Sequence, residues 1–447
     1  MTQVSGMHTL AEKILYRKIK LDLTNVRGEV KVYQLYVSLA SKRHRAKFIR
    51  SLTIARHPEE QDLRKSIVVG GHGALPFESD LYGRGSSSKS IRRHHFRYIL
   101  DDPYFAETVA VPQILAYAES LKTFDLRGTT RVSPRASAVG LVEWDCFHPT
   151  FQRALMDMLE RKSVHTKIII GINGIPAQAM QTLRARKHFQ IVHCGIDTNT
   201  TEETQAAPNL ANLPLSMNSI SILGMLRQSK MSILSLVTGR EISTLTYEIN
   251  FREEFTHLQN VLGLACIQRS LTELTIITFY IFGKNVNSGR CMPIGWTWEA
   301  NGRLDLTQLQ LQVLVLNFKT WNRRKHGGIE GYDEWRWALE ILRSLADRRR
   351  KSTDRDLRII ELNVGWNNQF CPEALWEPEQ WKEWDHVLAR HVKNGMEQIR
   401  ISITGGPRIS PDYSVESSGH KIRMSMVESF PSVGLGQLTV DYITKDF

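Results

Sequence analysis

The sequence has few cysteines and no long uninterrupted apolar run. It contains 5 cysteines in 447 residues, and none has a Cys-x-x-Cys partner, which argues against a disulfide framework or a zinc site. Residues 1–24 lack the apolar core of a secretory signal. The most apolar stretch, 271–282, is too short to span a bilayer and carries Glu273. These absences predict a soluble cytoplasmic or nuclear protein without a membrane partner.

Recognisable catalytic and cofactor-binding patterns are also missing. Residues 83–90 look like a phosphate-binding loop, but Ser88 stands where that loop requires its second glycine. The run 70–73 is similar to an oxyanion loop, yet no Gly-x-Ser-x-Gly nucleophile elbow accompanies it. His94 and His95 have no carboxylate or cysteine at metal-ligand spacing. We therefore predict no enzymatic activity, no cofactor and no metal site.

A six-residue pattern, apolar-x-x-apolar-x-apolar, does recur through the second half of the chain. It occupies residues 231–236, 271–276, 311–316, 357–362, 396–401 and 435–440. Steps of ~40 residues between successive motifs are typical of a repeat architecture. Between the motifs, helical spacing such as Trp335, Leu339 and Leu342 predicts one helix and one strand in each unit. Strands of successive units should pair in parallel through right-handed crossovers.

The first half follows the same rule less regularly. We expect strands near 49–54, 121–126, 167–172 and 189–196, and helices near 33–39, 111–118 and 176. Residues 70–97, rich in Gly, Ser, Arg and His, are predicted to form a flexible insertion. The predicted fold is α/β, an irregular leucine-rich-repeat-like solenoid in which a curved parallel sheet carries helices on its outer side. Its units exceed the ~20–29 residues of typical leucine-rich repeats, and no asparagine ladder is expected.

Residues between the apolar positions of a strand point away from the core. They are distinctly polar in the last units, which predicts a protein-binding surface there. Tryptophan is the second signal, because nine of the ten lie in residues 296–384. Large aromatics form either binding hot spots or core, and the spacing of Trp381 and Trp384 favours core. The candidate binding residues are Glu273, Thr275, Glu361, Asn363, Trp366, Arg400, Ser402, Thr439 and Asp441.

The chain carries an excess of positive charge. Its 58 lysines and arginines outnumber its 46 aspartates and glutamates, for a formal net charge of +12, which favours acidic partners. Charge runs are usually solvated loops or helix ends, and no aromatic-interleaved nucleic-acid motif accompanies these runs. A basic nucleic-acid-binding solenoid is therefore the less favoured alternative. The runs lie at 42–45, 92–95, 323–325 and 348–351.

Residues 12–21, which read Glu-Lys-Ile-Leu-Tyr-Arg-Lys-Ile-Lys-Leu, resemble the end of an F-box, which commonly reads Leu-Tyr-Arg-x-Ile before a strand. Segments 35–40 and 49–54 resemble the first repeat of fungal (basidiomycete-type) F-box proteins with leucine-rich-repeat-like C-terminal regions. Two C-terminal motifs fit the same group: Trp381-x-x-Trp384-Asp385-x-x-Leu388 and Phe430-Pro431-x-x-x-x-Gly436-x-Leu438-x-Val440.

The resemblance implies an organisation and a function. Residues 1–24 would hold the residual F-box tail and first strand, and residues 25–447 the solenoid. Such a chain is expected to be a non-enzymatic interaction module similar to the substrate-recognition part of a Skp-cullin-F-box ubiquitin ligase. Its partners would be an unidentified target protein and, only if an F-box is encoded upstream, a Skp-type adaptor. A stand-alone interaction scaffold or a truncated gene product without a ligase link is the alternative.

Overall fold

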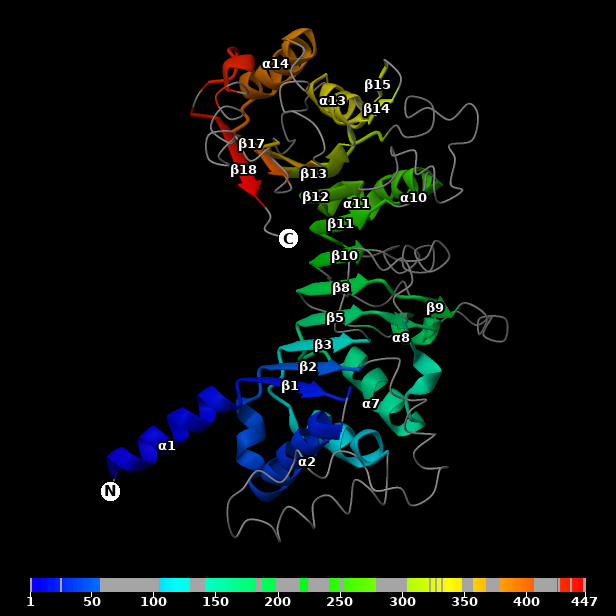
Figure 1. Ribbon diagram of the computed structural model, residues 1–447, viewed down its shortest axis with the longest axis vertical. Coiled ribbons are helices and arrows are strands. Elements are labelled where there is room, and N and C mark those ends of the chain that lie inside the picture. Colours follow the sequence, from blue (N-terminus) through cyan, green and yellow to red (C-terminus); the bar gives the residue numbers. More distant parts are fainter. Residues whose placement is uncertain are drawn as a thin grey trace. The chain divides into compact units, whose positions relative to one another are not determined.

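Figure 1 shows the computed structural model. Its chain divides into two compact units. Unit 1 comprises Met1–Leu210 and Gly224–Leu236, and unit 2 comprises Ala211–Leu223 and Val237–Phe447. The structure describes residues 2–24, 26–56, 104–128, 141–181, 183, 187–197, 218–223, 241–249, 253–278, 304–320, 323–325, 328–330, 333–347, 357–366, 378–405, 424, 427–434 and 436–444. The predicted insertion at 70–97 and the predicted strand at 231–236 lie outside these residues, and the predicted boundary at residue 24 stays a prediction.

Unit 1 is built on parallel strands that neighbour one another in chain order. They are β1 (Lys18–Asp22), β2 (Ser51–Ala55), β3 (Thr123–Arg127), β5 (Thr166–Ile170) and β8 (His188–Val192). Two short parallel pairs join β4 (Val142–Glu143) to β6 (Ile172–Asn173) and β7 (Ile175–Pro176) to β9 (Ile196–Asp197). The helices are α1 (Thr2–Leu15), α2 (Val26–Ser41), α6 (Val111–Tyr117), α7 (Pro149–Glu160) and α8 (Ala177–Gln181), with short turns η1 (Arg43–Phe48), η2 (Ala106–Ala110) and η3 (Trp144–Cys146).

Unit 2 repeats this arrangement with longer strands. They are β10 (Ser219–Leu223), β11 (Thr244–Glu248), β12 (Glu273–Thr278), β13 (Val313–Thr320), β16 (Ile359–Trp366), β17 (Gln398–Gly405) and β18 (Leu438–Thr444), again parallel and in chain order. An antiparallel hairpin of β14 (Arg323–Lys325) and β15 (Gly328–Glu330) follows β13. The helices are α10 (Glu253–Leu262), α11 (Ala265–Ser270), α13 (Asp333–Ala346) and α14 (Pro378–Lys393).

The predicted α/β solenoid is confirmed in both units. Helical spacing located α13 and α14 correctly, and α2, α6 and α8 also fall where helices were expected. α14 ends just before Gly395, whose φ of 91° lies in the left-handed region that favours glycine. The alternation of apolar residues in the strand motifs is matched by the register, because Leu274, Leu314 and Ile360 are paired directly across β12, β13 and β16.

The predicted repeat length of ~40 residues was wrong for part of the chain. Strands β10 and β11 were not predicted, and β11 rather than the segment 231–236 pairs with β12. In register, 29 residues separate Leu245 from Leu274, and 22 separate Lys167 from Phe189. These spacings fall within the ~20–29 residues of leucine-rich repeats. The chain therefore mixes short repeats with units near 40 residues.

Aromatic packing forms the interior of unit 2 around one tryptophan. The ring of Trp335 lies edge-on to Phe318, Trp381 and Trp384 at centroid distances of 5.2, 5.2 and 5.4 Å. Trp381 in turn contacts Phe430 at 5.5 Å. Edge-to-face pairs at these distances stabilise the fold in addition to the stabilisation that comes from burying apolar area. The cluster thus joins α13 and α14 to β13.

A buried ion pair occupies the interior of unit 1. Arg56, after β2, donates to the Oε1 atom of Glu107 in η2, and both residues are 7 % exposed. The guanidinium of Arg56 also lies 5.0 Å from the ring of Phe147. The other carboxylate oxygen accepts the backbone N–H of His148, at the start of α7, at 2.8 Å. Because both charges have several partners, the pair satisfies the usual condition for burying ions.

Candidate functional site

Along the strands of unit 2, side chains point alternately into the buried interior and toward a partly exposed face. On β12, Leu274 and Ile276 are fully buried, whereas Glu273, Thr275 and Ile277 are partly exposed. The same two-residue period continues through β13, β16, β17 and β18. Figure 1 shows α10, α11 and α13 on one side of the strands of unit 2, and the ring contact between Phe318 and Trp335 marks that side as the interior.

We call the partly exposed side the open face of unit 2. Its described side chains include Thr244, Thr246, Glu248, Glu273, Thr275, Ile277, Val313, Val315, Asn317, Ile359, Glu361, Asn363, Gln398, Arg400, Ser402, Thr439 and Asp441. The parallel register aligns them in rows that cross the strands. Apolar residues of β13 and β16 occupy its middle, and polar residues surround them, a mixture typical of protein interfaces.

The register brings most of the predicted binding residues together. Thr275, Glu361, Arg400 and Thr439 belong to one row, which passes through Val315. Three more of them share the next row, where Asn363, Ser402 and Asp441 are neighbours on β16, β17 and β18. Glu273 belongs to a third row, between Thr244 and Val313. These eight residues form one surface on unit 2.

Two of the predicted binding residues, Arg400 and Glu361, form an ion pair. Arg400 Nη1 donates to Glu361 Oε1 at 2.9 Å, with the two side chains 46 % and 27 % exposed. Glu273 Oε2 accepts the hydroxyl of Thr244 at 3.3 Å. Exposed ion pairs contribute at most about 1 kcal/mol to stability. These contacts therefore orient side chains on the open face more than they stabilise the fold.

The tryptophans divide between core and undetermined positions. Trp335, Trp337, Trp381 and Trp384 are each 5 % exposed or less, which confirms the prediction of core for these residues. Trp366 is the last residue of β16 and pairs in register with Thr320 and Gly405, but its side chain lies outside the described residues. Its predicted role as an exposed contact stays a prediction.

The described side chains of the corresponding strand face of unit 1 have a positive net charge, whereas those of the open face of unit 2 have a negative one. It carries the cations Lys18, Lys20 and Arg127 against the carboxylates Asp22 and Asp125, a balance of +1. Arg127 Nη2 donates to Asp125 Oδ2 at 2.7 Å, and this hydrogen bond raises the pKa of Arg127. Among its described side chains, the open face of unit 2 carries four carboxylates and one arginine, a balance of −3.

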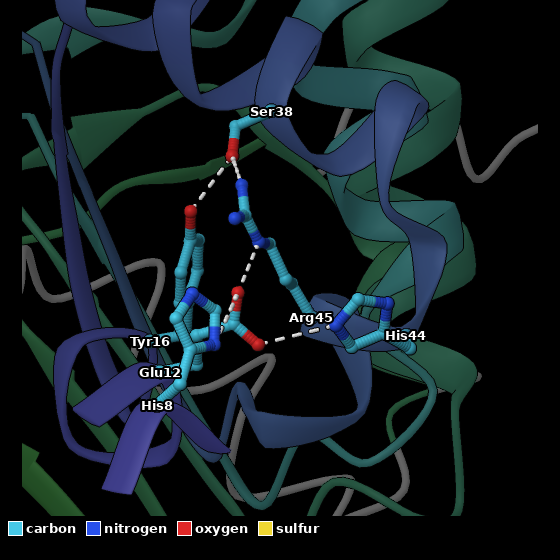
Figure 2. A network of polar contacts seen from close by, with 6 residues as sticks. All are labelled: His8, Glu12, Tyr16, Ser38, His44 and Arg45. Carbon is cyan, nitrogen blue, oxygen red and sulfur yellow. Dashed lines mark hydrogen bonds and ion pairs between the residues drawn. The ribbon is translucent and has the colours of Figure 1, made fainter. Parts of the chain in front are cut away.

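Sequence reasoning missed a polar network that anchors α1 to unit 1 (Figure 2). Arg45 of η1 donates from Nε to Glu12 Oε1 at 2.8 Å and from Nη1 to Ser38 Oγ at 2.7 Å. His44 Nε2 lies 3.1 Å from Glu12 Oε2. Tyr16 reaches the same Ser38 hydroxyl at 2.7 Å. These contacts join α1, α2 and η1 through one carboxylate and one guanidinium.

The network also sets the charge state of its central carboxyl. Burial raises the pKa of Glu12, but hydrogen bonds from His44 and Arg45, together with the charges of Arg45 and His8, outweigh it. The pKa of Glu12 therefore lies below its usual value, and the carboxylate form is favoured.

Around Glu12, the described residues of α1 are exposed, and several of them are apolar. Met7, Leu10, Ile14 and Leu15 are 74, 58, 67 and 70 % exposed. They supply most of the large exposed apolar side chains in the described part of the chain, where the others are Tyr104 and Met424. Met7, Leu10 and Ile14 recur at i, i+3 and i+7, the spacing of a helix that inserts into an apolar groove. We call these four residues the α1 stripe.

Cys194 is a buried free cysteine. Burial raises the pKa of the Cys194 thiol to about 12, so this cysteine is a poor nucleophile. Its Sγ instead lies 3.2 Å from the carbonyl oxygen of Val192. Across the described ranges, no three His, Cys, Asp or Glu side chains are grouped to hold a metal ion. None of the described helices has the length and apolarity to cross a membrane.

Comparison with known proteins adds no identification. No protein-family model matches the chain, and no curated protein matches it significantly.

Proposed function

We propose that this protein is a non-enzymatic protein-interaction module whose open face on unit 2 binds a target protein. The observation that carries the proposal is the alignment of eight predicted binding residues on one partly exposed surface. β12, β16, β17 and β18 contribute two of them each, so the surface is extended. Repeat proteins use such extended faces to hold large partners.

The α1 stripe favours a second contact, on unit 1. Ile14 and Leu15 of this stripe fall in the segment that resembles an F-box tail. If an F-box is encoded upstream, that resemblance implies a Skp-type adaptor of a cullin-type ubiquitin ligase as the partner. Four large apolar side chains, each more than half exposed, form an interaction surface of the kind found in partner-binding helices. In this proposal unit 2 selects the target and α1 contributes to the link with the ligase. A scaffold without a ligase link would use only the open face.

Site-specific photo-crosslinking in cells of the source organism tests target binding. A benzophenone side chain replaces Thr275, Asn363 or Ser402 on the open face, and matched control proteins carry it at Lys382 or His386, exposed residues of α14. We expect one discrete crosslinked protein from the open-face positions and none from α14. Equal labelling from both sets, or labelling from α14 alone, would contradict the proposal.

The adaptor contact is tested separately with a purified Skp-type adaptor. Leu10→Asp with Ile14→Asp should abolish co-elution, because two charges would have to enter an apolar groove. Gln34→Asp, an exposed position on α2, is the matched control and should co-elute like the original protein. If the folded original protein fails to bind the adaptor, the ligase link is refuted and the scaffold alternative stands.

A further inference from the structure

One register row on the open face of unit 2 is polar along most of its length. The row begins with Glu248 on β11 and Ile277 on β12. It continues through Asn317, Asn363, Ser402 and Asp441 on β13, β16, β17 and β18. We call these six residues the polar row. Carboxylates therefore stand at its two ends, and two amides occupy neighbouring strands in its middle.

The middle of the polar row has unused hydrogen-bonding capacity. Among the described residues, the side chains of Asn317 and Asn363 have no hydrogen-bond partner, whereas Glu361 in the adjacent row is paired with Arg400. An asparagine amide offers both a donor and an acceptor. Two such amides on adjacent strands can bind the N–H and C=O groups of a peptide backbone that passes across them.

The described side chains of this face have a net charge opposite in sign to that of the whole chain. The protein has a net charge of +12, but the charged side chains described on the open face are four acidic residues, Glu248, Glu273, Glu361 and Asp441, and one basic residue, Arg400. Complementary charge selects partners and accelerates encounter. A nucleic acid would place its phosphates against these carboxylates, so the face favours a cationic partner.

The length of the row fits a short extended segment. Five steps between adjacent strands separate Glu248 on β11 from Asp441 on β18, and at about 4.8 Å a step the ends lie about 24 Å apart. An extended peptide covers that distance with about seven residues at 3.4 Å each. Lysine and arginine side chains at both ends of such a segment would meet the two terminal carboxylates.

We infer that the polar row binds an extended basic segment of the target protein. This inference rests on the proposed function and specifies its ligand. The backbone of the segment pairs with Asn317 and Asn363, and its terminal cations contact Glu248 and Asp441. Because the chain as a whole is positive, non-specific attraction predicts the reverse preference, for anionic ligands.

Fluorescence anisotropy with the full chain tests the preference. The probes are three labelled oligomers: a 12-residue peptide of alternating lysine and glutamine, a 12-residue peptide of alternating glutamate and glutamine, and a 12-nucleotide single-stranded RNA. We expect saturable binding of the basic peptide at least tenfold tighter than that of either anionic probe. Equal or tighter binding of an anionic probe would overturn the inference.

Variants locate the binding on the polar row. The double variant Glu248→Gln with Asp441→Asn should lower the affinity for the basic peptide about tenfold and make that affinity less dependent on salt. The double variant Asn317→Ala with Asn363→Ala should lower the affinity for the basic peptide several-fold without changing the salt dependence of binding. The matched control, Glu160→Gln with Glu428→Gln, removes two exposed carboxylates outside the open face and should bind normally. Circular dichroism and thermal midpoints establish that each variant folds.

The outcome separates the inference from the proposed function. If the polar-row variants retain full affinity for the basic peptide, the inference is wrong. Should crosslinking from Asn363 still capture one discrete protein, target recognition by the open face survives with a different ligand class. If crosslinking also fails, both are refuted.

Discussion

Units 1 and 2 share a parallel strand arrangement but stabilise their interiors differently. In unit 1 the pair Arg56–Glu107 joins β2, η2 and the start of α7, whereas in unit 2 the ring of Trp335 joins β13, α13 and α14. An ion pair in the interior requires both charges and all their partners at once. An aromatic cluster depends on shape, and each ring contributes by the area it buries. The same architecture therefore tolerates two kinds of interior with different sensitivities to substitution.

The units also differ where they face solvent. Among the described side chains, unit 1 exposes the α1 stripe and a strand face with a charge balance of +1, and unit 2 exposes an open face with a balance of −3. Neither difference follows from the shared strand pattern, because that pattern is carried by the buried residues. The exposed positions are those that selection can change without loss of the fold.

The largest expected effect comes from the aromatic cluster of unit 2. Trp335→Ala should lower the free energy of unfolding by about 3–5 kcal/mol, because it removes a buried ring and leaves a cavity between three others. Chemical denaturation followed by circular dichroism measures the loss. Trp335→Phe is the control and should lose less. A loss below about 1 kcal/mol would show that the cluster can close around the missing ring.

Breaking the ion pair of unit 1 should have a similar or slightly smaller effect. Glu107→Ala leaves the guanidinium of Arg56 buried without its carboxylate, at a cost of about 3 kcal/mol. The double variant Arg56→Met with Glu107→Leu should recover much of that loss, since no unpaired charge remains. If the double variant is as unstable as the single one, packing rather than charge explains the pair. No second substitution should rescue Trp335→Ala in this way.

Exposed and buried pairs on the two strand faces should differ measurably. A double-mutant cycle on Glu361 and Arg400 should give a coupling energy below about 1 kcal/mol that falls with added salt. The same cycle on Asp125 and Arg127 should give a larger coupling that salt changes less, because Asp125 is 5 % exposed. If the two pairs gave equal coupling energies and equal salt responses, the predicted difference between the strand faces of the two units would be wrong.

The last expected effect is local to α1 and depends on pH. Because the folded-state pKa of Glu12 lies below its usual value of 4.5, its ionised contacts contribute fully above about pH 4.5. That contribution is lost as the pH falls through the lowered pKa. Hydrogen exchange in residues 7–16 should accelerate over this range. Glu12→Gln should exchange faster at neutral pH and lose the pH response; an unchanged response would exclude Glu12 as its cause.

Several elements could be predicted because their signal is local. Leu314 and Leu316 on β13 and the apolar side of α13 repeat at strand and helix periods, and each period identifies a face before any neighbour is known. The candidate residues of the open face followed from the same alternation. Their alignment was predictable because parallel strands with matched motifs pair in one register.

Other features depend on groups that the sequence does not place side by side. Lys167 occupies a core position on β5 and is fully buried, which the pattern of strand residues alone would not favour. Its Nζ donates to the carbonyl oxygens of Leu159 and Arg161 at the end of α7, where helix carbonyls lack partners of their own. Strands β10 and β11 were missed because the motif at 231–236 matched the ~40-residue period more closely.

By itself the sequence determined the class of fold and which strand residues are exposed. Both follow from the spacing of apolar residues along the chain, which is a property of one segment at a time. The tertiary structure decided how α1 is anchored, with Glu12 meeting Arg45 and the α1 stripe left in solvent. It also decided the register that gathers carboxylates and amides into the polar row. Hydrogen bonds and charge balance require partners from distant segments, and only the folded chain brings those segments together.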